Sequence, residues 1–176
     1  SEADELRKKL EETNKDIKRR VEELKRRLEE SNERIEELVR RNEKKSKDLL
    51  DDVRRRGVDE KVLKKIEEVV DRNRKLLKEA LDVNKKVVDE IEDRLRRVLD
   101  KNRKVVEEVE RELRDSSEEV LKRLDKKLED SRRDVERVEK EVEELLRESE
   151  ERVKRVVETV DKTDEEVKKD VDDKRR

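Results

Sequence analysis

The chain contains no cysteine, histidine, proline or methionine, no aromatic residue, and a single glycine among its 176 residues. Without cysteine or histidine, the chain can form no disulfide, thiol nucleophile, Ser-His-Asp triad or ordinary zinc site. Without aromatics, it lacks the side chains that stack on nucleic-acid bases or anchor helices at membrane surfaces. No apolar run approaches the roughly 18 residues of a membrane span, and Ser1–Asp4 resembles no signal peptide. We therefore expect a soluble protein, whose compartment the sequence leaves unknown.

Charged residues make up 62% of the chain, but 54 basic and 56 acidic side chains leave a net charge of only −2. This balance removes any strong attraction to nucleic acid or anionic membranes. Acids and bases alternate at helical spacing, as in Glu22–Arg26 and Glu36–Arg40, which is typical of exposed helix faces. We therefore predict no enzyme activity, no cofactor, no metal site, and no nucleic-acid or membrane partner.

Apolar and small polar residues recur every three or four positions, which is the spacing of one face of an α-helix. One such stripe runs from Leu6 to Val53, a second from Ile66 to Leu113, and a third from Leu124 to Val171. Gly57 is suited to end the first helix, and Asp59 to begin the second. The second break is weaker: it lies at Asp115, Ser116 and Ser117, where Ser116 and Glu119 have the spacing of a capping box.

The polar residues within the stripes predict how the helices align. If the chain reverses at Gly57, Val58 and Asp59, and again at residues 115–117, the polar positions fall on three shared levels. These levels hold Asn14, Asn102 and Ser131; Asn32, Asn84 and Ser149; and Asn42, Asn73 and Thr159, with Ser46 and Thr163 near the third.

We therefore predict an all-α fold: a single-chain, up-down-up three-helix bundle of long, nearly straight helices. The helices are expected near residues 1–56, 59–114 and 117–176, in one domain. The alternative is a second break that stays helical, so that residues 59–176 form one long helix that needs partner chains.

The polar layers are expected to fix the helix register. A misaligned helix would bury an unpartnered amide, at a cost of roughly 1–3 kcal/mol. A ligand or ion site is disfavoured, because Asn, Ser and Thr carry no charge and three-residue layers leave no obvious cavity.

The second helix carries an additional apolar stripe along one flank. This flank is predicted to pack at the boundary of the bundle rather than against another copy, because it is mostly valine and lacks aromatic or arginine anchors. Its members are Val62, Val69, Leu76, Ala80, Val83, Val87, Val98 and Val105.

The sequence resembles those of computationally designed, straight helical bundles with buried hydrogen-bond layers. The resemblance rests on the two loops, on the eighteen-residue spacing from Asn14 to Asn32 to Leu50, on the aligned polar layers, and on surfaces of Glu, Lys, Arg and Asp. It implies a stable scaffold without an evolved substrate. We expect a monomer that needs no partner. Because the bundle is long and its residues favour helix, we also expect cooperative unfolding at high temperature. The alternatives are a coiled-coil or single-helix spacer, or a building block that self-associates through the second helix.

Overall fold

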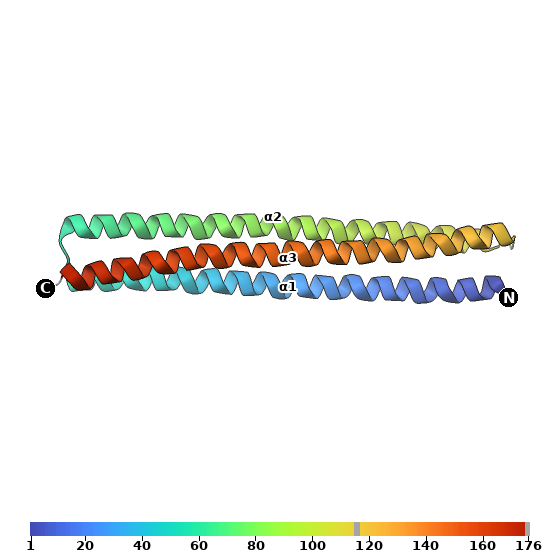
Figure 1. Ribbon diagram of the computed structural model, residues 1–176, viewed down its shortest axis with the longest axis horizontal. Coiled ribbons are helices and arrows are strands. Elements are labelled where there is room, and N and C mark those ends of the chain that lie inside the picture. The colour runs from blue at the N-terminus through green and yellow to red at the C-terminus, as the bar shows by residue number, and fades with distance from the viewer. Residues whose placement is uncertain (115–116, 175–176) are drawn as a thin grey trace. The chain divides into compact units, whose positions relative to one another are not determined.

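The computed structural model describes residues 1–114 and 117–174, which form three α-helices. Helix α1 spans Glu2–Arg56, α2 spans Glu60–Glu112 and α3 spans Glu118–Lys174 (Figure 1). The helices pack against one another pairwise, so the predicted all-α three-helix bundle is confirmed. A single helix over residues 59–176 is excluded, since Arg123 on α3 pairs with Glu112 at the end of α2 over 2.6 Å.

The first turn lies at Gly57, Val58 and Asp59, where the sequence predicted it. Gly57 has a φ of +70°, a conformation that costs glycine little and other residues more. Three arginines fill the last turn of α1, where positive charge suits the helix dipole. The backbone carbonyl of Asp59 accepts a hydrogen bond from the amide of Leu63 at 2.9 Å, which makes Asp59 the N-cap residue of α2.

The start of α3 is capped by Ser117. Its hydroxyl oxygen accepts a hydrogen bond from the amide of Val120 at 3.4 Å, and its carbonyl accepts one from the amide of Leu121 at 3.1 Å. The capping role expected of Ser116, like the turn position of Asp115, lies outside the described residues.

The chain divides into two compact units, each built from segments of all three helices. Unit 1 comprises Ser1–Glu29 and Val88–Leu146, and unit 2 comprises Glu30–Val87 and Arg147–Arg176. Unit 1 has a leucine-rich core of Leu6, Leu10, Val109, Leu113, Leu121, Leu124 and Leu128. Unit 2 has two apolar clusters that contain more valine: one includes Ile35, Leu77 and Val153, and the other includes Val53, Ile66 and Val171.

The buried face of α1 differs from the predicted stripe by one residue at three points. Thr13, Ser31 and Leu49 are buried, whereas their neighbours Asn14, Asn32 and Leu50 are half-buried. A helix that packs against two others uses both of two adjacent residues, because each one faces a different neighbour. A single stripe drawn through the sequence records only one of the two.

The flank of α2 is mostly covered, as boundary packing requires. Ala80 and Val98 are buried, and four of the valines (Val62, Val69, Val87 and Val105) are half-buried. Leu76 and Val83 instead expose 40% and 38% of their surface. Over the described residues, no helix has an apolar stretch of the length needed to cross a membrane.

Candidate functional site

The first polar layer lies in unit 1 and joins α1 to α2. The side-chain amide of Asn102 donates a hydrogen bond to Oδ1 of Asn14 at 2.9 Å. Asn102 is buried and Asn14 half-buried. Ser131 on α3 is also buried, but within the described chain it shares no hydrogen bond with Asn102. The layer therefore contains one hydrogen bond between two of the three residues that the sequence placed together.

The second layer lies in unit 2 and links all three helices. Asn84 on α2 donates from Nδ2 to Oδ1 of Asn32 on α1 at 2.7 Å, and its own Oδ1 accepts a hydrogen bond from the hydroxyl of Ser149 on α3 at 2.9 Å. Asn84 is 4% exposed and Ser149 1% exposed. The structure thus brings together the three residues of this layer, with the amide of Asn84 at its centre.

The third polar cluster, also in unit 2, has a different composition from the predicted layer. Nδ2 of Asn42 donates to Asp161 at 2.7 Å, and the hydroxyl of Ser46 donates to Asp164 at 2.8 Å. Nδ2 of Asn73 donates to the other oxygen of Asp164 at 3.4 Å. Asn42, Ser46 and Asn73 are buried, and two carboxylates of α3 accept their hydrogen bonds.

Thr159 does not join this cluster, and the prediction that it would is wrong. Its side chain is exposed, and its hydroxyl donates to the backbone carbonyl of Arg155 at 2.9 Å. Thr163 does the same with the carbonyl of Thr159, also at 2.9 Å. A threonine within a helix can turn its hydroxyl to the carbonyl four residues earlier, and Thr159 and Thr163 do so instead of bonding to another helix.

Two buried polar residues and three acidic partners were missed. Ser31, next to Asn32, donates its hydroxyl to Glu150 at 2.9 Å, and Arg34 donates to the same carboxylate at 2.8 Å. Thr13, next to Asn14, is 1% exposed, and its hydroxyl has no hydrogen-bond partner. The spacing of eighteen residues from Thr13 to Ser31 was a signal in the sequence. No signal in the sequence marked the acceptors Glu150, Asp161 and Asp164, because the many acids on the helix surfaces look alike there.

The environments of the acceptors Asp164 and Glu150 shift their pKa values in opposite directions. Burial raises the pKa of Asp164, and the nearby charge of Asp161 adds to the rise, whereas the hydrogen bonds from Ser46 and Asn73 oppose it. Burial by itself would raise the pKa of Glu150, but the hydrogen bonds from Arg34 and Ser31 outweigh it, so the pKa is lowered.

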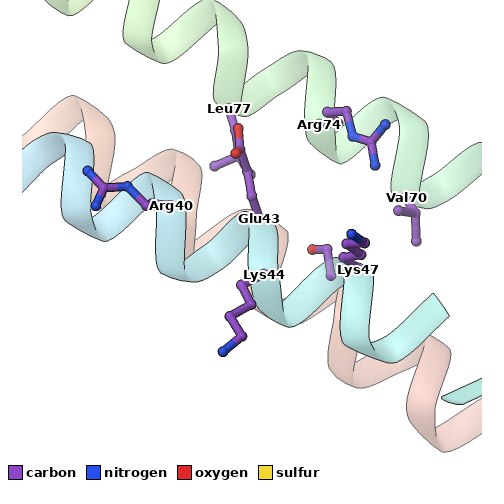
Figure 2. A pocket seen from close by; sticks show the side chains of 8 residues that line it. Arg40, Glu43, Lys44, Lys47, Val70, Arg74 and Leu77 are labelled. Carbon is purple, nitrogen blue, oxygen red and sulfur yellow. The ribbon is translucent and has the colours of Figure 1, made fainter. Parts of the chain in front are cut away.

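A surface opening beside the third polar cluster does not gather groups for chemistry. This opening of about 370 Å³, between α1 and α2 in unit 2, is lined by Arg40, Glu43, Lys44, Ser46, Lys47, Val70, Arg74 and Leu77. Its charged side chains do not converge: Lys44 points away from α2, whereas Arg74 points toward α1 (Figure 2). The hydroxyl of Ser46 is already engaged with Asp164. Among residues 1–114 and 117–174, no group of three or more Asp, Glu, His or Cys is placed to hold a metal ion.

Comparison with known proteins finds no matching family model, no similar curated protein and no similar solved structure.

Proposed function

We propose that the chain is a designed structural scaffold without catalytic activity, and that its buried polar layers fix the register in which its helices pack. The observation that carries this proposal is the hydrogen-bonded group of Asn32, Asn84 and Ser149. Its central amide both donates and accepts, each time to a different helix. Sliding any of the three helices by one turn would replace these partners with apolar side chains.

The energetics favour a role in specificity over one in raw stability. Apolar residues of suitable size in place of a satisfied polar group are often neutral or stabilising, whereas an unpartnered buried amide costs about 1–3 kcal/mol. Polar layers therefore penalise wrong registers more than they reward the right one. The members of the two layers are uncharged amides and hydroxyls, which suits structural hydrogen bonding better than proton transfer.

The repetition of the layers supports the designed origin. Asn14 and Asn32 are eighteen residues apart, as are Asn84 and Asn102, and Ser131 and Ser149. Eighteen residues are about five turns of an undistorted helix, so both layers repeat one spacing, and in both an Asn of α2 donates to an Asn of α1. Three other features are typical of designed bundles: the N-cap residue of α2, the glycine that follows the end of α1, and the separation of apolar and polar residues onto opposite faces of every helix.

The test is a layer-free variant in which the four Asn residues of the two layers become Leu, and Ser131 and Ser149 become Ala. We expect unfolding in urea at an equal or higher concentration, together with a multiplied or broadened set of backbone amide signals in NMR, because several registers become similar in energy. The control variant changes only Ser131 and Ser149 to Ala, and it should keep a single set of signals. A layer-free protein with one sharp set of signals would contradict the proposed role of the layers.

A further inference from the structure

In unit 1, ion pairs join α2 and α3 along the line where the two helices meet, which we call the α2–α3 seam. The ion pairs across it follow one antiparallel register, in which each step forward along α2 is matched by an equal step back along α3. They are Arg94–Glu141 at 2.5 Å, Lys101–Asp134 at 2.6 Å, Glu112–Arg123 at 2.6 Å, and Glu108–Lys127. Each pair covers the apolar core beneath it with a neutralised, hydrated surface.

In unit 2 the same register places different chemistry on this seam. This register would put residue 151 opposite Asn84 and residue 162 opposite Asn73, so the hydrogen bonds Asn84–Ser149 and Asn73–Asp164 each differ from it by two residues, in opposite directions. The register therefore sets Leu76 opposite Thr159, and Val83 opposite Arg152. Leu76 and Val83 are eighteen residues before Arg94 and Lys101, so they occupy the same side of α2 as the two cations that form pairs in unit 1.

Two apolar side chains in this part of the seam, Leu76 and Val83, are exposed to solvent. Among the described residues, Leu76 and Val83 are the large hydrophobic side chains with the greatest exposure, at 40% and 38%. On the facing helix, Thr159 and Thr163 turn their hydroxyls back to backbone carbonyls, so the groups that they can offer to a neighbour are methyls. Leu76 and Val83 are seven residues apart, which is the heptad spacing at which side chains contact a helix packed alongside.

The same place on α3 carries a cation, Arg152. Its Nη1 atom is covered by the chain itself and has no hydrogen-bond partner among the described residues, whereas the equivalent α3 position in unit 1 is Asp134, which pairs with Lys101. Unit 2 therefore has a positive charge on this part of α3 where unit 1 has a carboxylate, and this charge favours an acidic group on whatever packs over the seam.

The charges around the exposed stripe favour an acidic occupant. The neighbours on the outer side of Leu76 and Val83, one turn away along α2, are Arg72, Glu79 and Lys86, two of which are cations. A second copy packed through the same stripe would bring these cations near each other. An acidic helix would instead meet them with opposite charge.

We propose that the α2–α3 seam of unit 2 is a docking surface for a single amphipathic α-helix of another protein. This helix carries apolar residues at heptad spacing, flanked by carboxylates that face the cations Arg72, Lys86 and Arg152. The surface does not depend on the role proposed above for the polar layers.

The probe is a synthetic helical peptide about four heptads long, with Leu at a and d, Glu at e and g, and one Trp. A matched peptide has Lys at e and g. Because the chain has no aromatic residue, the Trp fluorescence anisotropy reports the peptide alone. We expect saturable binding of the acidic peptide, and at least about tenfold weaker binding of the basic one.

The variant transfers the ion-pair seam of unit 1 to unit 2. It combines Leu76→Arg with Thr159→Glu, and Val83→Lys with Arg152→Asp, which reproduces pairs that the chain already forms at the same register. These changes lower the net charge by one, and so does the control Lys85→Gln, which lies on the side of α2 opposite Leu76. We expect a loss of affinity of about tenfold or more for the transfer variant, and none for the control.

Circular dichroism establishes that the transfer variant is folded. If it is not, Leu76→Gln with Val83→Gln replaces it, with the same expected loss. Absence of binding by the acidic peptide would overturn the proposal, as would equal binding of the basic peptide or undiminished binding to the variant. Self-association of the wild-type chain in sedimentation equilibrium, lost in the variant, would also overturn it, because the occupant would then be a second copy.

Discussion

The hydroxyl of Ser149 and the amide of Asn84 should be energetically coupled. Ser149 is 1% exposed and donates to Asn84 at 2.9 Å, so Asn84→Ala leaves its hydroxyl without that acceptor. A stranded buried hydroxyl costs about 1–3 kcal/mol. Part of this cost is recovered if the hydroxyl turns to the carbonyl of Leu145, as Thr159 does with Arg155 in the same helix. We therefore expect a favourable coupling of about 1–2 kcal/mol.

A double-mutant cycle measures this coupling. The cycle comprises the wild-type protein, Asn84→Ala, Ser149→Ala and the double variant, each unfolded in urea and followed by far-ultraviolet circular dichroism. The matched control is the same cycle on Asn102 and Ser131 in unit 1. These two residues share no hydrogen bond within the described chain, so their coupling should stay within about 0.5 kcal/mol. Equal couplings in the two cycles, or one below about 0.3 kcal/mol for Asn84 and Ser149, would refute the reasoning.

Three further predictions concern single positions. Thr13→Val removes a buried hydroxyl that has no partner and keeps the shape of the side chain, so it should raise the free energy of unfolding by about 1 kcal/mol, measured in urea; a loss would show that the hydroxyl is solvated. Asp164→Asn should stabilise the protein near neutral pH, by at most about 1 kcal/mol because the site is partly exposed. Since the folded pKa of Asp164 is raised, the wild-type protein bears the cost of a buried charge above that pKa. This cost disappears as the pH falls through the folded pKa toward about 4, so urea midpoints of the two proteins should converge there. A difference that does not change with pH would contradict this cause. Gly57→Ala should cost about 1 kcal/mol through the backbone alone, because φ is +70° and an added Cβ meets nothing within 4 Å. A thermal melt that does not change would argue against the left-handed cap.

The pattern of the sequence predicted the helices and one turn well, because their causes are local. The stripes recur every three or four residues, and Gly57 is the only residue that takes a left-handed conformation cheaply. The resulting helix bounds agree with the structure to within a few residues at each end. The second layer was predictable for a related reason: Asn32, Asn84 and Ser149 are polar residues in apolar stripes, and reversal of the chain aligns them.

The third cluster was only partly predictable, because its acceptors are acids. Asp161 and Asp164 look like surface carboxylates in the sequence, and only the packing of α1 and α2 against α3 distinguishes them from the others. Thr159 fitted the spacing of the layer. Its hydroxyl, however, found a carbonyl of its own helix, an option that spacing alone does not weigh against a partner on another helix.

The sequence by itself determined which segments are helical, where the first of them ends and which levels are polar, since periodicity, caps and turns depend on residues that are near one another in the chain. Tertiary structure alone decided which of two adjacent residues faces which neighbour, as with Ser31 and Asn32. It also decided which acids become acceptors, and why Leu76 and Val83 stay exposed while the rest of their stripe is covered. These outcomes depend on the rotation of each helix about its own axis against two others, which sets burial and is written in no single segment of the chain.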